Sequence, residues 1–239
     1  AEVTEALEYQ TATSEVLDVI SRSPNEIEPV LDAILDVAAR LCNPQYAYVA
    51  LLNPQDDLYH IVTTRHVDPE FEAFLRDNPI RRDHGSSSGR AAILAETVYI
   101  EDTQADDSYK WKEAARRGGY LTTLAIPLVK EGQALGVIAL ADERRSAYSP
   151  KQISLLETFA SQAVIAIGNA RLFDEVQQRT AEVEEALVRE QASAEILQVI
   201  AEATSDLQPV FDLIVQKSAE LCGAKFCAFD RFDGDLYHF

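Results

Sequence analysis

Residues 121–141 read LTTLAIPLVKEGQALGVIALA, two runs of β-favouring residues separated by a short polar segment. Apolar side chains dominate both runs, whereas Lys130–Gln133 carries the glycine and charges that are typical of a turn. This pattern predicts a β-hairpin with strands over Leu121–Val129 and Leu135–Ala141. The neighbouring sequence supplies the elements that complete a sheet around it.

The sequence before this hairpin alternates between helical and extended patterns. Residues 26–41 carry an apolar stripe at helical spacing, and residues 47–67 (AYVALLNPQDDLYHIVTTRHV) form two β-rich runs around a turn at 53–57. Between the two hairpins we expect a helix at 69–76, a helix beginning near Gly89, a strand at 98–101 and a polar segment at 102–119 with a helical turn near Trp111. Strands in this order predict an α+β fold with an antiparallel sheet flanked by helices.

A long helix is expected after the second hairpin. Ser149 and Pro150 make a good cap and first residue, and no further proline occurs before Pro209. Continued to Glu202, this helix measures about 80 Å. Its first half carries an apolar face suited to the sheet. The second half predicts a weak coiled coil, because apolar residues recur at four-and-three spacing in the seam Val176, Thr180, Val183, Leu187, Glu190, Ala194 and Leu197, which Thr180 and Glu190 interrupt.

The chain also contains an internal repeat. AEVTEAL at 1–7 returns as AEVEEAL at 181–187, LC at 41–42 returns at 221–222, and LYH at 58–60 returns at 236–238. Ser23–Asn25 breaks the first helical pattern. We therefore expect four regions, namely the end of an upstream signalling helix (1–22), one complete domain (23–169), a coiled-coil linker helix (170–202) and the truncated start of a second domain (203–239).

Composition excludes several classes of function. The net charge of −19 argues against nucleic acid and anionic lipid, which bind clusters of lysine and arginine, so we expect no nucleic acid partner and no membrane contact by this chain. No apolar run approaches the ~20 residues of a membrane span. The three cysteines have no metal-binding spacing and suit a reducing compartment. We expect a cytoplasmic protein without a metal site.

Several motifs together resemble a GAF domain. They are the helix ending RLC (40–42), HGSSSGRAA (84–92), TVYIED (97–102), the hairpin at 121–141 with its Ile-Pro-Leu and Gly-Val-Ile, and SPKQISLLETFASQAVIAIGNARLF (149–173). The resemblance covers about residues 24–173. It implies a six-stranded antiparallel sheet with the N- and C-terminal helices on one face and a small-molecule pocket on the other.

The closer resemblance is to tandem GAF arrays that precede bacterial sensor histidine kinases and, less often, nucleotide cyclases. It implies a sensory or regulatory module in a two-component phosphorelay, which is not itself an enzyme but belongs to a parent histidine kinase. We expect a homodimer through helices 1–22 and 150–202 that relays a signal to a downstream output domain. The alternatives are a ligand-free structural spacer for dimerisation, or the regulatory region of a cyclase.

The resemblance places the pocket within residues 80–120 and on the adjoining sheet. Arg90 follows Gly89 at a helix start, where it would hold an anion or pair with a carboxylate. Trp111, with Tyr109 and Tyr120, would stack a flat ligand or form a lid on the sheet. The candidate ligand-binding residues are Gly89, Arg90, Asp102, Trp111, Thr122 and Thr123.

No cofactor is evident in this sequence, although an unidentified small molecule remains open. A covalent bilin is not expected because no cysteine lies between Asn43 and Leu221, and the NKFDE signature of cyclic-nucleotide-binding members is missing. His84 is a haem ligand or a solvated loop residue. Cys42 alone cannot supply the several pocket cysteines of the methionine sulfoxide reductase branch. No catalytic motif is found, and Glu101, Asp102, Asp106 and Asp107 lack the order of a calcium loop.

The two main hypotheses differ in what fills the pocket. A sensory module predicts an empty cavity under residues 80–120, whereas phenylalanine, leucine and tyrosine side chains in that space favour a structural spacer. In either case Thr180 and Glu190 weaken one register of the coiled coil, which allows two arrangements of the helix pair to exchange.

Overall fold

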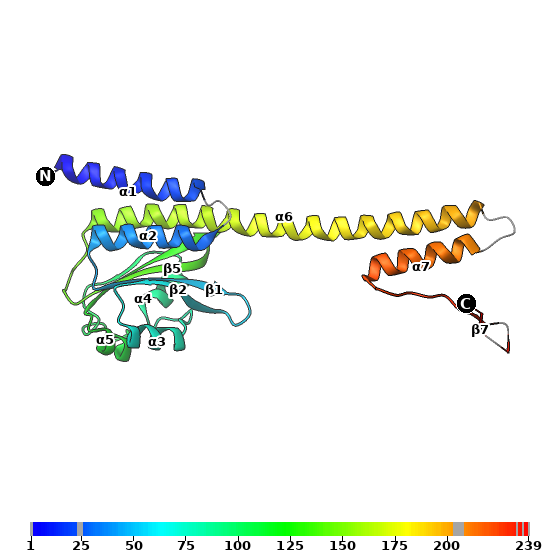
Figure 1. Ribbon diagram of the computed structural model, residues 1–239. Helices are drawn as coiled ribbons and strands as arrows, with labels where there is room; N and C mark the ends of the chain where they lie inside the picture. The colour runs from blue at the N-terminus through cyan, green and yellow to red at the C-terminus, as the bar shows by residue number, and fades with distance from the viewer. Residues whose placement is uncertain (1, 23–25, 203–207, 233, 236, 239) are drawn as a thin grey trace. The chain divides into compact units, whose positions relative to one another are not determined.

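The computed structural model describes residues 2–22, 26–202, 208–232, 234–235 and 237–238. The expected break at Ser23–Asn25 lies outside these residues. Helices lie on both faces of a central sheet in the first part of the chain (Figure 1). The elements are α1 (Glu2–Arg22), α2 (Ile27–Cys42), β1 (Tyr46–Asn53), β2 (Leu58–Arg65), α3 (Pro69–Asp77), α4 (Ser87–Leu94), β3 (Val98–Ile100), α5 (Lys112–Gly118), β4 (Thr122–Lys130), β5 (Gln133–Asp142), α6 (Pro150–Glu202), α7 (Gln208–Cys222), β6 (Arg231–Phe232) and β7 (Tyr237–His238).

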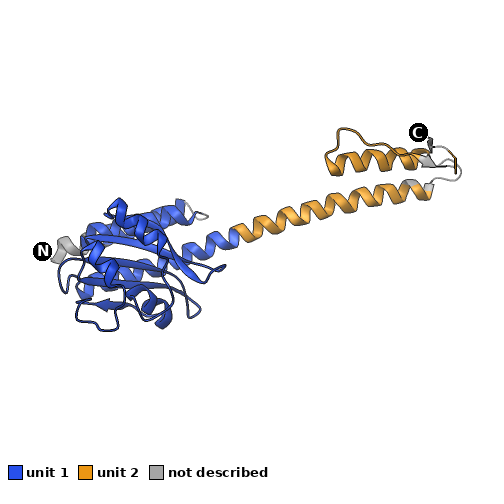
Figure 2. Ribbon diagram, turned by 90° about the horizontal axis from the view of Figure 1, so that it is seen from below, with its two compact units in different colours: residues 1–173 blue, residues 174–239 orange. Residues whose placement is uncertain are grey.

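Two compact units divide the chain, residues 1–173 and residues 174–239 (Figure 2). The first unit contains α1 to α5, the central sheet and the first part of α6. The second unit contains the remainder of α6, α7 and the short β6–β7 pair. The helix α6 contributes residues to both units, as the long helical pattern predicts.

The central sheet has the strand order β2-β1-β5-β4-β3, and every neighbouring pair is antiparallel. This confirms the predicted α+β class. The second hairpin is longer than expected, because β4 reaches Lys130 and β5 begins at Gln133. Only Glu131 and Gly132 form the turn, and their φ angles of 52° and 79° fit the two-residue type I′ geometry that suits the twist of the strands.

The described sheet has five strands, so the expectation of six was wrong. At the free edge of β2, Ile80 forms a single antiparallel bridge with Tyr59, with two backbone hydrogen bonds of 2.9 Å. Pro79 has no N–H to donate on one side, and Asp83 closes a turn onto the carbonyl of Arg81 on the other. A sixth strand is therefore reduced to one bridge.

One face of the sheet packs against α2 and the first part of α6 (Figure 1). Alternate residues of β4 and β5 point toward these helices, as the period of two in a strand requires. They form one buried cluster with side chains from both helices. Its members include Leu124, Ile126, Leu128, Ile138 and Leu140 of the sheet, Leu31, Ile34 and Leu35 of α2, and Leu156, Phe159 and Ile167 of α6.

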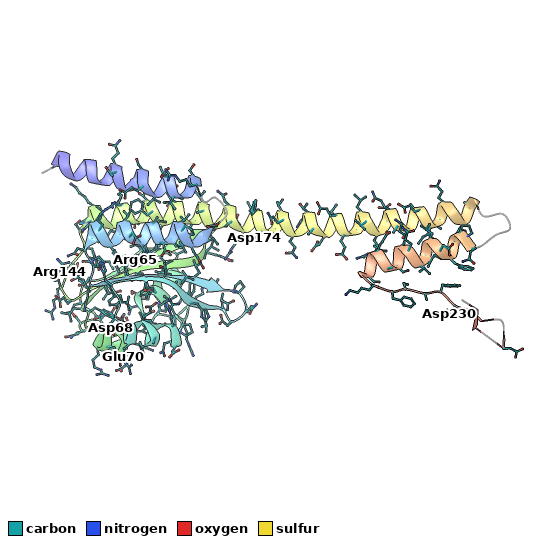
Figure 3. All side chains as sticks on the ribbon, in the orientation of Figure 1. Arg65, Asp68, Glu70, Arg144, Asp174 and Asp230 are labelled. Atoms are coloured by element: carbon teal, nitrogen blue, oxygen red, sulfur yellow. The ribbon has the colours of Figure 1, made fainter. Side chains whose placement is uncertain are left out.

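Helix α1 adds to this cluster by packing on α2. Ala12 and Val16 are buried, and the guanidinium of Arg40 on α2 pairs with the carboxylate of Glu15 on α1. Ion pairs also connect α2 to the end of β2, where Arg65 donates to Asp32 at 3.0 Å and to Asp36 at 2.5 Å; Figure 3 labels Arg65 below α2. The N-terminal helices are thus attached to the sheet by apolar packing and by charge.

Within the described residues, one helical stretch, Pro150–Gln198, meets the length and composition of a membrane span, with a mean hydropathy of 1.2 in its most apolar part. Of that part, 44% is buried inside the protein. Leu156, Phe159 and Ile167 belong to the buried cluster on the sheet. Packing on the sheet accounts for the apolar character of this stretch.

The second unit repeats a feature of the first. Ala192 on α6 is buried, as Ala12 on α1 is, and Lys217 on α7 pairs with Glu195 on α6 at 2.7 Å. The start of the predicted second domain, at 203–207, lies outside the described residues. Within the truncated second domain expected at 203–239, the short strands β6 and β7 pair antiparallel.

Replacing Gly136 with alanine is expected to destabilise the first unit by about 1–3 kcal/mol. A Cβ on Gly136 would lie 2.6 Å from the carbonyl oxygen of Ala50 and 2.7 Å from Cδ2 of Leu51, so β1 and β5 must separate to accept it. The measurement is urea unfolding followed by circular dichroism. Gly168→Ala is the matched control, since its Cβ meets only Lys130 Nζ at 3.6 Å and a helical alanine should stabilise by about 1 kcal/mol. Equal stability of the two variants would contradict this packing.

Candidate functional site

The segment between the hairpins covers the second face of the sheet. Helices α3, α4 and α5 lie on this side, opposite α2 and α6 (Figure 1). The sheet residues that point to this side include three small ones at its centre, Ala125 on β4 and Ala139 and Ala141 on β5. The same strands carry leucine and isoleucine on the other side. The alanines leave room above the centre of the sheet.

Tyrosine side chains occupy this room. Tyr46 and Tyr48 stand on β1 opposite Ala141 and Ala139, and both are buried. Tyr120 packs edge-on against Tyr46, with ring centroids 5.5 Å apart. The five buried tyrosines of this cluster are Tyr46, Tyr48, Tyr59, Tyr109 and Tyr120. The space in which a ligand was expected is therefore filled by the protein's own side chains.

The tyrosine hydroxyls find partners inside the cluster. Tyr48 and Ser88 share a hydrogen bond of 2.9 Å, Tyr109 and Tyr120 share one of 2.5 Å, and Tyr59 donates to the carbonyl of Ala134 at 2.8 Å. Burial raises the pKa of Tyr48 to about 12 and holds those of Tyr109 and Tyr120 well above the ordinary range of tyrosine. These hydroxyls stay protonated at neutral pH and serve as structural donors rather than as bases.

Helix α4 begins above this cluster at Ser87, two residues before the expected start near Gly89. The Ser86 hydroxyl caps it by accepting from the N–H of Gly89 at 2.9 Å, and the hydroxyl of Ser87 meets that of Thr123 on β4 at 2.9 Å. Gly89 has to be glycine, because a Cβ there would lie 2.6 Å from the carbonyl oxygens of Arg81 and Asp83. The serines thus connect α4 to the sheet and leave the Gly89 N–H satisfied.

Arg90 pairs with a carboxylate, the second of its two predicted roles. Its Nη1 lies 2.5 Å from Asp106 Oδ2, and its Nε donates to the carbonyl of His84 at 2.7 Å. The Arg90 guanidinium, and then Ser108, hold the pKa of the Asp106 carboxyl well below its ordinary range. Nη2 of Arg90 is buried without a hydrogen-bond partner among the described residues. The ion pair fixes the loop after β3 onto α4.

The other two polar candidates lie apart from Arg90. Asp102 pairs with Arg145 at 3.0 Å, in the loop beyond β3. The Thr122 hydroxyl donates to the carbonyl of Glu101 at 2.7 Å, and Thr122 points to the face opposite Thr123 because the two are adjacent on one strand. The structure therefore brings Gly89, Arg90 and Thr123 together around the start of α4 and separates Asp102 and Thr122 from them.

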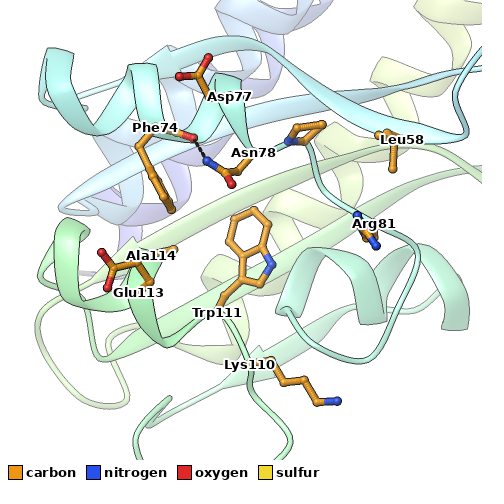
Figure 4. Close-up of a pocket in the computed structure, with 10 residues that line it drawn as sticks. Leu58, Phe74, Asp77, Asn78, Arg81, Lys110, Trp111, Glu113 and Ala114 are labelled. Atoms are coloured by element: carbon orange, nitrogen blue, oxygen red, sulfur yellow. Dashed lines mark hydrogen bonds between the residues drawn. The ribbon is translucent and has the colours of Figure 1, made fainter.

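Trp111 packs against the tyrosine cluster and lines a surface pocket of about 370 Å³, where Figure 4 shows its indole in the middle of the lining residues. Its backbone N–H donates to the carbonyl of Gly85 at 3.2 Å, and the N–H of Lys110 donates to the same oxygen at 2.7 Å. Tyr109 and Tyr120 do not share this pocket, since they are buried against each other. Ten residues line it, namely Leu58, Phe74, Asp77, Asn78, Pro79, Arg81, Lys110, Trp111, Glu113 and Ala114. We refer to it as the Trp111 pocket.

Cys42 is not placed to act as a nucleophile on the tyrosine side of the sheet. Cys42 lies in the cluster on the other face of the sheet, and burial raises the pKa of its thiol to about 12, so it is not a thiolate at neutral pH. No group of three or more histidine, cysteine, aspartate or glutamate side chains is placed to hold a metal ion in the described parts of the chain.

Sequence reasoning missed most of the Trp111 pocket. Arg81 and Lys110 were not among the candidates, because 29 positions separate them in the chain and neither belongs to a motif. Phe74 was predicted only as part of a helix, and nothing in the sequence indicated that it lines a pocket. The available signal was the Arg81-Arg82 pair, which is unusual in a chain with a net charge of −19.

A profile of the GAF domain family matches residues 25–168. Among solved structures, a GAF domain of a phosphoenolpyruvate-protein phosphotransferase from Coxiella burnetii has a TM-score of 0.60 and 16% identity, over 71% of this chain and 98% of that one. Free methionine-R-sulfoxide reductase from Neisseria meningitidis, solved with its substrate, has a TM-score of 0.59 and 15% identity over 71% and 93%.

A domain of a putative two-component sensor histidine kinase from Sinorhizobium meliloti has a TM-score of 0.53 and 21% identity, over 64% of this chain and 99% of that one. No curated protein matches the chain. At these identities the solved structures support the fold alone.

Replacing Arg90 with glutamine should lower the free energy of unfolding at pH 7 by about 1.5–3 kcal/mol, because it removes the charged partner of a largely buried carboxylate. The lowered pKa of Asp106 means that this stabilisation is complete above about pH 4 and declines as the pH falls further. The difference between wild type and Arg90→Gln should therefore shrink on acidification, measured by urea unfolding at several pH values.

Arg116→Gln is the control for this prediction. Arg116 pairs with Glu113 on the exposed surface of α5, so its replacement should change stability little. A deficit of Arg90→Gln that grows below pH 4 would contradict the assigned ion pair.

Proposed function

The chain belongs to the GAF domain family, and we propose that it is a regulatory module that relays a change in domain packing along α6 to a downstream output domain. The proposal depends on one observation, the participation of α6 in both units. Its residues Leu156, Phe159 and Ile167 lie in the core of the first unit, and its residues beyond 173 belong to the second. A shift of the core therefore moves the helix itself.

The second half of α6 has the surface that a helical partner requires. Val176, Val183, Leu187 and Leu197 are 52–66% exposed although they are apolar. They recur at four-and-three spacing, which places them along one seam of the helix. We propose that a second copy of the chain covers this seam in a homodimer, with α1 as a further contact.

We propose that the polar residues in the seam allow the helix pair to adopt two registers. Thr180 donates to the carbonyl of Val176 at 2.8 Å, within its own helix, and Glu190 adds a charge at a core position of the pair. Both weaken one register of the dimer, so that a difference of a few kcal/mol is enough to shift the population between two registers.

A path connects the second face of the sheet to α6. Ser87 on α4 meets Thr123 on β4, and the next residue of that strand, Leu124, packs in the cluster that holds Phe159. A displacement of α4 would thus reach α6 through one strand. The tyrosines that fill the second face favour transmission without a ligand in that space, which is the structural alternative among the original hypotheses.

We further propose that the output domain is a histidine kinase in a cytoplasmic two-component system. The assignment rests on the resemblance of the sequence to GAF arrays that precede sensor histidine kinases. A domain of similar fold from Sinorhizobium meliloti is itself described as part of such a putative kinase. The parallel between the α1–α2 and α6–α7 contacts supports a tandem array, in which the linker helix of one domain is the first helix of the next. The regulatory region of a cyclase is the alternative output.

Replacing Leu187 with glutamate should dissociate the homodimer, because it buries two charges in the seam. We expect the dissociation constant from sedimentation equilibrium to rise by about tenfold or more. Gln178→Glu adds the same charge outside the seam and should leave the dimer intact. Dimers of equal strength in the two variants would contradict the assigned seam.

Replacing both Thr180 and Glu190 with leucine should hold the helix pair in one register. Two more apolar seam positions stabilise one register, so the dissociation constant should fall, again by about tenfold or more. In the full-length parent we expect autophosphorylation that no longer responds to the input. An unchanged response of the double variant would count against the relay, and cyclase activity without autophosphorylation would favour the alternative output.

A further inference from the structure

We propose that the Trp111 pocket binds a planar aromatic carboxylate, with its ring against Trp111 and its carboxylate between Arg81 and Lys110. None of the five buried tyrosines lines this pocket, although Ala114 belongs to their cluster and Phe74 and Trp111 pack against it. The inference does not depend on the relay, because binding in the pocket requires no movement of α6.

The pocket has the size and the wall of a small-molecule site. Its volume of about 370 Å³ falls in the range of about 300–1,000 Å³ that is usual for such sites. Phe74, Trp111 and Ala114 form an apolar wall, and Figure 4 shows the indole of Trp111 standing in the middle of the lining residues. Trp111 is only partly buried, so one part of its ring remains available to a ligand.

Two cations at the rim have no partner. The side chains of Arg81 and Lys110 form no ion pair and no hydrogen bond with any described residue, whereas most other arginines of the first unit are paired with carboxylates. Their backbones are nevertheless held in place. The Arg81 carbonyl accepts from the N–H of Asp83 at 2.9 Å, and the Lys110 N–H donates to Gly85. The backbones of Arg81 and Lys110 are therefore held in place, whereas their charged groups are unpaired.

The acidic residues of the pocket do not cancel these charges. Glu113 accepts from Arg116 at 2.7 Å and from Arg117 at 2.7 Å, so its carboxylate is already neutralised. Arg117 also stands over the ring of Phe74, at 4.6 Å from its centroid. Asp77 is then the only other acidic residue in the lining, where Arg81 and Lys110 are the two basic ones. The lining therefore offers two unpaired cations against one remaining acid, which favours an anionic ligand although the chain as a whole has a net charge of −19.

The geometry of the groups selects a carboxylate on a flat ring. A guanidinium binds a carboxylate through two parallel hydrogen bonds, and a neighbouring ammonium adds a further charged donor. An aromatic ring stacks on indole at low entropic cost because both are rigid. Arg81, Lys110 and Trp111 line the same pocket, so the proposed ligand has its ring on the indole while the flexible ends of Arg81 and Lys110 turn toward its carboxylate.

The single tryptophan of the chain makes a direct test possible. Trp111 is the only tryptophan, so incorporation of 5-fluorotryptophan gives one ¹⁹F resonance that reports on this pocket alone. The full chain is titrated with 1-naphthoate, and with 1-naphthamide as the neutral ligand of the same shape. We expect a saturable shift with 1-naphthoate and at least about tenfold weaker binding of the amide, because the amide loses the charged hydrogen bonds.

Three variants complete the experiment. The double variant Arg81→Ala, Lys110→Ala should weaken 1-naphthoate by about tenfold or more, whereas Arg82→Ala, which removes an adjacent cation outside the lining, should leave the affinity unchanged. All three side chains are exposed, so the fold is expected to persist, as circular dichroism would verify. Trp111→Phe, followed by calorimetry, should retain binding of 1-naphthoate with reduced affinity.

Two results would overturn the inference. One is the absence of a saturable ¹⁹F shift with 1-naphthoate, and the other is equal affinity for the amide or for the double variant, which would mean simple apolar adsorption. Neither result bears on the relay, because the relay is tested by the dimer and by the output of the parent protein. Conversely, a monomeric chain that binds 1-naphthoate through Arg81 and Lys110 would retain this site and remove the relay.

Discussion

The packing of α6 on strands β4 and β5 is the interaction on which the rest of the first unit depends. Leucine and isoleucine from two adjacent strands meet Phe159 and its neighbours, and α2 fills the remaining space on the same face. Helix α1 then attaches to α2 through Ala12, Val16 and an ion pair. Because an interior is close-packed, these helices cannot move independently of one another. In the proposed relay, the side chains that form the core of the unit would also carry the signal to α6.

The two faces of the sheet obey different chemistry. The helix face is almost entirely aliphatic, whereas the other face combines alanines with tyrosines whose hydroxyls bond to serine, to tyrosine or to a backbone carbonyl. A buried hydroxyl without a partner costs free energy, so this network specifies one arrangement of α4 and the loop after β3. The Arg90–Asp106 pair reinforces it. A polar cluster of this kind orders a surface segment that has few apolar residues of its own.

The sequence predicted those parts of the fold that periodicity encodes. The hairpin at 121–141 and the helix after Pro150 were found because their apolar residues recur at two and at 3.6 positions. The absence of a sixth strand could not be predicted in this way. Pro79 and the turn at Asp83 limit the backbone hydrogen bonds at the sheet edge, and they leave no mark on the pattern of apolar residues. The partner of Arg90 was not predictable either, because Asp106 comes from a loop 16 positions away. The alternation of residues along a strand predicts which face of the sheet Ala139 lies on, but it does not predict that Tyr48 is its neighbour on β1.

The alanine and tyrosine pairing on β1 and β5 makes the domain an engineerable receptor. Tyr48 stands opposite Ala139, and Ala50 and Ala125 lie in the same cluster. The ring of Tyr48 therefore fills space that the three small alanine side chains would otherwise leave empty. Shortening that single side chain would leave an apolar chamber under α4, with Ser88 as a free hydroxyl at its edge. A synthetic ligand shaped to that chamber would then control α4 from inside the sheet, in a domain whose own side chains now keep it closed.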